Sequence, residues 1–243
     1  MNLLSQAGVE FLMRWGHFMA GITWIGLLYY FNFVQGAFFA EASAGTKNEA
    51  TVKLVPRALW WFRYAALLTW LTGVVILLLY PANYGGGSHA IYTTEKGTTI
   101  LVGSLLGTIM MLNVWGIIWR KQKVIIASTA SVLAGGEANP AAASAGRRAL
   151  LASRTNVVMS IPMLFSMAGA SHFAWAPSKT GGSLGLFWLL ILAIVAVLEY
   201  NAIAGDKGIT TKFLDKHKDA ITAGFVVTAL IYAIAMFTTH SPV

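Results

Sequence analysis

Long, nearly uninterrupted apolar stretches dominate the amino-acid sequence, and they limit the possible folds more than any other feature. Each is close to the roughly 20 residues that an α-helix needs to cross the hydrocarbon core of a bilayer. They cover residues 9–33, 59–80, 98–119, 150–175, 184–204 and 220–238. The short alternating segments that are typical of outer-membrane barrels are not seen. We therefore predict an all-α, polytopic transmembrane helical bundle with about six spanning helices.

The composition agrees with a chain that lies almost wholly in the membrane. Of the 243 residues, 57% are hydrophobic and only 11% are charged, whereas a soluble domain carries about 25% charged residues. No linker, strong internal repeat or soluble catalytic module interrupts the apolar stretches, so we expect a single integral membrane domain over residues 1–243. The first charged residues are Glu10 and Arg14, and no small-residue cleavage site follows closely. We expect the first stretch to be retained, because it does not have the pattern of a signal peptide.

Lysine and arginine are concentrated in alternate connections between the predicted helices. The second and fourth connections carry only Lys96 and Lys179. The first, third and fifth carry Lys47, Lys53, Arg57, Arg120, Lys121, Lys123, Arg147, Arg148, Arg154, Lys207, Lys212, Lys216 and Lys218. The positive-inside rule then places these connections in the cytoplasm and both termini outside it. This topology explains the net charge of +8 without a nucleic-acid partner. Membrane lipid is the expected partner, and the bacterial inner membrane is the expected location.

The third connection is the longest, and two structures are open for its first part. Residues 121–133 either continue the third helix into the cytoplasm or lie on the membrane surface. Residues 134–146 are rich in alanine and glycine and contain Pro140. This composition is typical of a flexible turn.

The chain contains no cysteine, which narrows the cofactors that it can hold. Iron–sulfur clusters, thiolate metal sites and the covalent attachment of a c-type haem all need cysteine. A metal bound by these residues must therefore use histidine, methionine, asparagine, tyrosine or carboxylate ligands.

Two histidines inside the predicted helices are the leading candidates for a cofactor site. His17 in the first helix and His172 in the fourth lie toward the same, outer face when the two helices are antiparallel. Gly21 lies one turn from His17, and Gly169 lies one turn from His172. Small residues leave room for a flat macrocycle, and neutral imidazoles are common axial ligands of haem. We predict that His17 and His172 bind one b-type haem. The sequence identifies no catalytic residue.

Two further residues of the first helix complete the predicted site. Arg14 lies one turn outward from His17 on the same face, where it can pair with a haem propionate. Glu10, one turn further, is a competing partner for the guanidinium. Trp24 continues the same face on the inward side.

Other interpretations of these residues stay open. Intramembrane histidines also occur as hydrogen-bonded packing residues, and glycines often mark close helix contacts. His172 lies close to Trp175, so it also fits the aromatic belt at the membrane interface. His89 and His240, both in outer segments, would suit a copper or zinc site, although no H-x-x-x-H spacing supports one.

Arg63 and Glu199 lie near the cytoplasmic ends of their helices, where long side chains reach the interface. Each has several possible partners. They can pair with each other, or with Asn113 or Asn156.

Several segments resemble the membrane domain of the bacterial urate oxidases that are coupled to cytochrome c. The segments are RWGH (14–17), GITWIG (21–26), YYF (29–31), WW (60–61), TWLTG (69–73), NVW (113–115), IWRKQK (118–123), TN (155–156), IPMLFSM (161–167) and HF (172–173). They cover the first four predicted helices, whereas the last two are similar only vaguely. The first-helix pattern also resembles copper-resistance membrane proteins and the bacterial membrane protoporphyrinogen oxidase.

The resemblance implies a haem-b redox protein that passes electrons from a small molecule such as urate to a periplasmic cytochrome c. In that family the cytochrome follows the last helix. Here the chain reaches Val243 without cysteine, so we expect a separate electron acceptor. The alternatives are a non-catalytic integral subunit of a larger respiratory or oxidase complex, or a transporter, for example of copper. A homo-oligomer is compatible with each of these functions.

Overall fold

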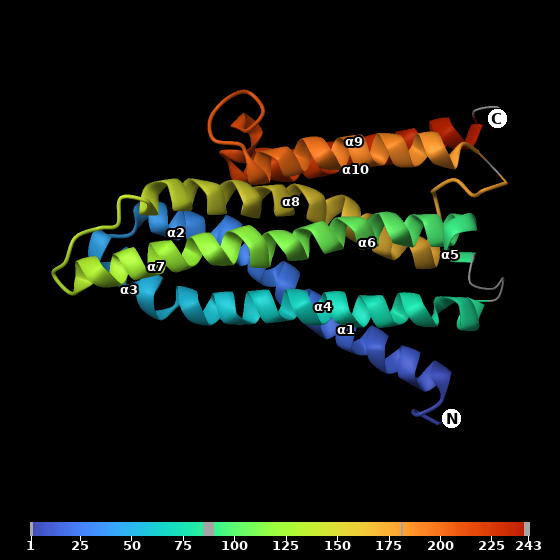
Figure 1. Cartoon of the computed structure of the whole chain (residues 1–243), viewed down its shortest axis with the longest axis horizontal. Helices are drawn as coiled ribbons and strands as arrows, with labels where there is room; N and C mark the ends of the chain where they lie inside the picture. The colour runs from blue at the N-terminus through green and yellow to red at the C-terminus, as the bar shows by residue number, and fades with distance from the viewer. Residues whose placement is uncertain (1, 85–89, 181, 241–243) are drawn as a thin grey trace.

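A computed structural model describes residues 2–84, 90–180 and 182–240 of the chain. All regular structure in these residues is helical (Figure 1). Six of the helical runs are long and apolar enough to cross a membrane. The prediction of an all-α, multi-pass bundle of about six spans is therefore confirmed.

The first span is longer than the apolar stretch that predicted it. Helix α1 (Gln6–Tyr29) continues through a π-helical turn, η1 (Tyr30–Gln35), into α2 (Gly36–Glu41). The Ser5 side chain caps α1 by accepting a hydrogen bond from the backbone N–H of Gly8. A short helix, α3 (Ala44–Lys53), leads to the second span, α4 (Val55–Tyr84).

The third span is one continuous helical run. After α5 (Ala90–Thr93), helix α6 (Glu95–Asn113) continues through the π-helical turn η2 (Val114–Ile118) into α7 (Trp119–Leu133). At 1.5 Å per residue this run is about 58 Å long, nearly twice the roughly 30 Å core of a bilayer. Of the two possibilities for residues 121–133, the structure shows continuation of the third helix.

Helix α8 (Ala142–His172) is the centre of the bundle. In its most apolar window, 67% of the residues are buried, compared with 22–39% in the other five spans. It begins inside the segment 134–146, so only the first part of that segment is a turn. Helices α9 (Leu184–Ile203) and α10 (His217–His240), joined by a connection that contains η3 (Lys212–Leu214), complete the fold on one side of α8.

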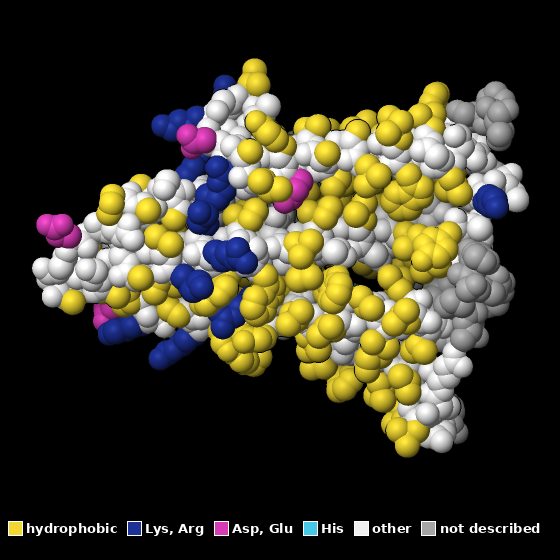
Figure 2. All heavy atoms as spheres, in the orientation of Figure 1, with side chains coloured by type: hydrophobic (Ala, Val, Ile, Leu, Met, Phe, Trp, Pro, Cys, Tyr) yellow, Lys and Arg dark blue, Asp and Glu magenta, His cyan; other side chains and the backbone are white. Residues whose placement is uncertain are grey.

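The two termini lie at the same end of the bundle, on the right in Figure 1. Lysine and arginine side chains gather toward the opposite end, and a band of hydrophobic side chains covers the bundle between the two ends (Figure 2). We call these the terminal end and the basic end. The arrangement fits the predicted topology, in which the basic end faces the cytoplasm.

Hydrogen bonds from tryptophans hold α4 against the third span. The Trp70 indole donates to the Thr108 hydroxyl at 3.1 Å, and the Trp115 indole donates to the Arg63 carbonyl at 3.0 Å. A continuous apolar core packs around them, with Phe62, Leu106 and Met159 fully buried. In a bilayer such packing and interhelical hydrogen bonds drive helix association, since lipid tails are themselves apolar.

Candidate functional site

A cavity of about 340 Å³ lies between α1, α4, α6 and α8, in the half of the bundle near the termini. We call it the His17 cavity. Its walls are His17, Phe18, Gly21, Ile22, Trp24, Ile25, Gly26, Thr69, Trp70, Gly73, Val74, Leu77, Ser104, Gly107, Thr108, Met163, Leu164 and Met167. Most of these are apolar, as in sites for largely hydrophobic ligands.

Glycines create the space in and around this cavity. A Cβ atom on Gly73 would lie 3.1 Å from Cε1 of His17, so the glycine allows the imidazole to lie directly against α4. A Cβ on Gly21 would meet only the Thr69 methyl group, at 3.8 Å. The predicted role of Gly21, to leave room beside His17, fits this geometry.

The His17 imidazole is held in one orientation by α4. Its Nδ1 lies 3.2 Å from the Thr72 hydroxyl oxygen. That hydroxyl already donates its single hydrogen to backbone carbonyls, at 2.7 Å to Leu68 and 3.0 Å to Thr69. Thr72 can therefore only accept from His17, which assigns the ring hydrogen to Nδ1. The lone pair is on Nε2.

The His17 ring also has a hydrogen bond to the backbone of Thr69. A carbonyl can only accept, so with the ring hydrogen on Nδ1 the lone pair of Nε2 is left for the cavity that the residue lines. A neutral imidazole with its other nitrogen hydrogen-bonded is the usual form of a histidine metal ligand. The Thr72 hydroxyl provides that second hydrogen bond.

Two methionines approach the same cavity from α8. Met163 and Met167 line it, and a thioether with an imidazole is one of the ligand pairs that hold haem iron. The hydroxyls of the cavity already have partners, because Thr108 donates to the Ser104 carbonyl at 2.7 Å and Ser104 donates to the Ile100 carbonyl at 2.8 Å. The space and the donor set therefore fit a flat, mainly apolar macrocycle with a metal at its centre.

His172 and Gly169 lie elsewhere. His172 is exposed in the last turn of α8, and neither residue belongs to the cavity wall. A Cβ on Gly169 would lie 2.8 Å from Nε1 of Trp175, so the space beside this glycine is filled by an indole. The structure brings together His17, Gly21 and Trp24, and it does not bring His172 and Gly169 into the same cavity. A haem shared by the two histidines stays a prediction.

Charged residues lie beyond the cavity toward the terminal end. The Arg14 Nε donates to Glu10 Oε1 at 2.8 Å, which is the competing contact that we expected. Lys96, at the start of α6, interacts electrostatically with both side chains. The contact with a propionate stays a prediction. Trp24 is buried, and its indole N–H has no hydrogen-bond partner within the described part of the chain.

The hypothesis of a copper or zinc site at the outer surface concerns residues that the structure does not place. His89 lies outside the described residues, and so does the side chain of His240. Across residues 2–84, 90–180 and 182–240, no three His, Asp or Glu side chains are grouped as a metal ion would require.

A buried polar cluster joins α6, α8 and α9. The Asn113 amide donates to Asn156 Oδ1 and to Glu199 Oε2, both at 3.0 Å, and Asn156 donates to the Met110 carbonyl at 3.0 Å. Of the partners left open for Glu199 from the sequence, the structure shows Asn113. Arg63 instead stacks on an aromatic ring, with its Cζ 3.9 Å from the ring centre of Trp119.

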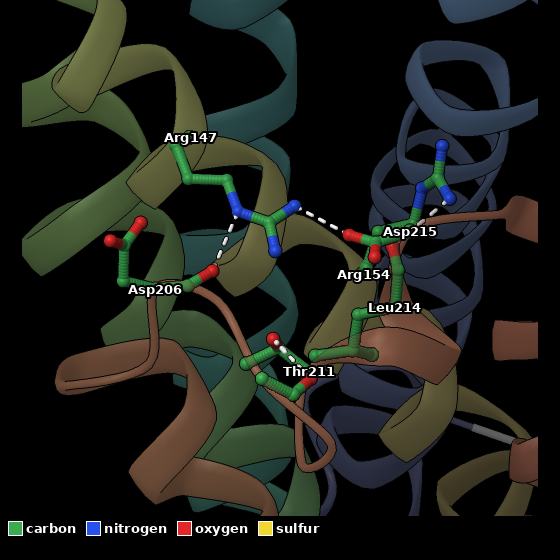
Figure 3. Close-up of polar contacts among 7 residues, drawn as sticks. Arg147, Arg154, Asp206, Thr211, Leu214 and Asp215 are labelled. Atoms are coloured by element: carbon green, nitrogen blue, oxygen red, sulfur yellow. Dashed lines mark hydrogen bonds and ion pairs between the residues drawn. The ribbon is translucent and has the colours of Figure 1, made fainter.

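Two arginines of α8 fasten the connection between α9 and α10 at the basic end (Figure 3). Arg147 forms an ion pair with Asp215 at 2.6 Å and donates to the Asp206 carbonyl at 2.9 Å. Arg154 is buried and donates to Asn32 Oδ1 at 2.8 Å and to the Leu214 carbonyl at 3.3 Å. From the sequence we interpreted both arginines only as topology signals.

Comparison with known proteins gives one match. Residues 83–239, more than half of the chain, match the family described as urate oxidase N-terminal. No curated protein and no solved structure matches the chain. The match extends through α9 and α10, so our expectation of only vague similarity in the last two helices was wrong. The segments that we quoted from the first two helices lie outside the matched range.

Proposed function

The chain belongs to the urate oxidase N-terminal family, and from this premise we propose that it is the membrane-embedded redox part of a urate-oxidising system. It accepts electrons from a small molecule, urate by its family, and delivers them to a periplasmic c-type cytochrome. The covalent haem of such a cytochrome needs cysteines, and these 243 residues contain none. The acceptor is therefore another polypeptide segment. We place the chain in the inner membrane, because a multi-pass protein there can contact a periplasmic cytochrome.

The main support is the His17 imidazole, whose free Nε2 belongs to an apolar cavity. A haem b bound there would supply reversible one-electron chemistry. His17 would bind its iron through Nε2, and Thr72 is a positioning residue that fixes the ring and its tautomer. Met163 or Met167 would offer a second ligand from α8. The mainly apolar walls would give the bound group a nonpolar environment.

Charged residues near the terminal end suit the propionate edge of the proposed haem. Arg14 and Lys96 provide positive charge there, beside the carboxylate of Glu10. A propionate group would add a second negative charge to this cluster. Such charge-assisted hydrogen bonds are stronger than neutral ones.

A second version of the proposal uses His172 in place of a methionine, as we expected from the sequence. It requires the end of α8 to turn toward α1, because His172 is exposed in this structure. Spectra of single variants distinguish the two versions. Loss of haem from His172→Ala favours the histidine pair, whereas loss from Met163→Ala or Met167→Ala favours the methionine.

The test is a reduced-minus-oxidised absorption spectrum of the purified chain in detergent. We expect the bands of a b-type haem in the wild type and their loss in His17→Ala. His217→Ala is the matched control, since this histidine begins α10 and is not part of the cavity wall. A wild-type spectrum without haem bands would contradict the redox proposal. Co-migration of that haem-free chain with a respiratory complex would indicate a non-catalytic subunit instead.

A further inference from the structure

A second cavity, of about 120 Å³, lies nearer the basic end of the same bundle. We call it the Gln35 cavity. Residues of η1, α4, η2, α7 and α8 form its walls: Phe31, Gln35, Leu59, Phe62, Ile118, Gln122, Gly146, Ala149, Leu150 and Ser153. Its volume is several times the 10–15 Å³ or so that one water molecule needs. The cavity therefore has room for more than a single ordered water.

The walls combine aromatic rings with small residues. The rings of Phe31 and Phe62 meet edge to face, with their centroids 5.4 Å apart. On the α8 side, a Cβ on Gly146 would have its nearest neighbour at 3.9 Å, so the helix leaves open space there. A flat ligand can lie against such rings, because aromatic faces accept other planar groups.

Three polar side chains belong to the wall of the Gln35 cavity. The Gln35 Oε1 atom is buried without a partner in the described chain. The Ser153 hydroxyl accepts from Asn32 at 2.8 Å, and no acceptor for its own hydrogen lies within the described residues. Gln122 is a half-buried wall residue of the same cavity. Of the three, only the Gln35 oxygen is both buried and without a partner in the described chain. A buried polar group without a partner is uncommon in native proteins and indicates a missing water, ion or ligand.

Both π-helical turns of the described chain contribute to this cavity. Phe31 and Gln35 belong to η1, and Ile118 belongs to η2. Such turns are rare, and they occur frequently at functional sites. Here they place residues from two different spans around one small polar space.

Basic residues adjoin wall residues of the cavity in the sequence and are gathered at the same end of the bundle (Figure 2). Gln122 lies between Lys121 and Lys123, and Ser153 precedes Arg154. The basic side chains gather at this end of the bundle (Figure 2). Arg154 donates to the Leu214 carbonyl (Figure 3) and to Asn32, and its side chain is not part of the cavity wall. A field of this sign raises the local concentration of anions.

We propose that the Gln35 cavity is the binding site for an oxopurine anion of the urate type. This inference rests on the proposed function. A carboxamide presents a donor and an acceptor side by side, which complements the N–H and C=O groups along the edge of an oxopurine. Gln35, Gln122 and Ser153 bind that edge. One of the perpendicular rings of Phe31 and Phe62 packs against a flat face of the ligand, and the other contacts its rim.

The separation of the two cavities suits electron transfer from a substrate in the Gln35 cavity to a cofactor in the His17 cavity. The nearest wall residues are Gly26 and Phe31 along the first span, and Ser153 and Met163 along α8. At 1.5 Å per residue, the two cavities are separated by about 8–15 Å along the helices. The substrate is therefore bound close to the proposed cofactor without sharing its cavity.

The test is binding of urate to the purified chain in detergent, measured by isothermal titration calorimetry. We expect Gln35→Leu and Gln122→Leu each to raise the Kd for urate at least about tenfold, because each removes a donor–acceptor pair. Gln6→Leu, at the start of α1, is the matched control and should bind as the wild type does. His17→Ala should also keep its affinity for urate.

The outcomes separate this inference from the proposed function. Unchanged urate affinity in both glutamine variants would overturn the site, leaving a cavity that holds only water, while the proposed function stands. No urate binding by the wild type would overturn the proposed function, and the inference with it. Ser153→Ala provides a milder change if a leucine variant fails to fold, and it should weaken urate binding while leaving the haem bands unchanged.

Discussion

The two cavities are formed by the same four spans, yet their walls have opposite chemistry. The His17 cavity is larger and apolar, and its hydroxyl groups already have hydrogen-bond partners. The Gln35 cavity is smaller and has three polar wall residues, Gln35, Gln122 and Ser153, of which Gln35 has a buried oxygen without a partner in the described chain. One helical bundle therefore offers two kinds of binding environment at different depths. The change follows the surface of the bundle, which is apolar between its two ends and charged at the basic end (Figure 2).

The difference determines where binding energy must come from. In the His17 cavity the protein offers an apolar shape, one imidazole lone pair and the thioethers of Met163 and Met167, so a metal-containing apolar ligand would gain the most there. In the Gln35 cavity the protein offers hydrogen bonds that it does not satisfy itself. The first environment suits a resident cofactor and the second suits an exchanging polar substrate. The variants below are arranged by how strongly they should affect this contrast.

The largest effect concerns which side of the membrane each cavity faces. A periplasm-specific phosphatase fused after Val243 should be fully active, because the basic residues lie in three alternate connections. The same enzyme inserted at residues 134–141 should be inactive. Activity only at the internal position would reverse the assignment, and would place the Gln35 cavity on the outer side.

His17→Ala should remove nearly all haem from the purified chain, since no other imidazole lines that cavity. Pyridine haemochrome absorbance per mole of protein measures this loss. Urate affinity should remain unchanged, because the Gln35 cavity is intact. Haem content equal to that of the His217→Ala control would mean that His17 is a packing residue.

Thr72→Val keeps the volume of the side chain but removes the hydroxyl that orients His17. Loss of such a supporting hydrogen bond typically costs about 10–100-fold in metal affinity. We expect partial haem loss and a shifted midpoint potential, measured by spectroelectrochemical titration. Thr69→Val, whose hydroxyl donates to the Ala65 carbonyl, is the control. Identical potentials in both variants would argue against an orienting role for Thr72.

Arg154→Leu tests how much this arginine contributes to the stability of the protein at the basic end of the bundle. The change leaves the carbonyl oxygens of Asn32 and Leu214 without the guanidinium. Each buried acceptor left unsatisfied costs about 1–3 kcal/mol. The melting temperature by fluorescence should fall, and urate affinity should fall with it because a nearby positive charge is lost. An unchanged melting temperature would show that water replaces the guanidinium freely.

Arg14→Ala should have the smallest effect. A partly exposed ion pair four residues apart on a helix contributes about 0.3–0.5 kcal/mol to stability. We expect near-normal haem content but a lower midpoint potential, since positive charge near a propionate favours the reduced haem. If neither changes, Arg14 serves only as a partner for Glu10.

The sequence predicted the spans correctly because length and hydropathy alone decide whether a helix can cross a bilayer. It left the partner of Glu199 open among Arg63, Asn113 and Asn156, and the contact with Asn113 came from the structure. It did not predict which way α8 faces. The equal depth of His17 and His172 fixes their height along the bundle, whereas the rotation of each helix depends on packing against its neighbours.

The Gln35 cavity was missed for a related reason. Gln35 and Gln122 lie where the apolar stretches end, and polar residues there are ordinarily solvated. The π-helical turns that bring them inward depend on tertiary contacts and have no clear sequence pattern. The only local signal was a glutamine close to Phe31 and Phe33 in an otherwise apolar segment.

The unbroken helical run of α6, η2 and α7 has a practical consequence for imaging. It reaches well past any bilayer or detergent belt, and the short turn at 134–141 leads straight into α8. A rigid helical protein spliced into that turn, in helical register with α7 and α8, would inherit their fixed orientation. A membrane protein of only 26.2 kDa would thereby gain a visible marker for particle alignment in electron cryomicroscopy.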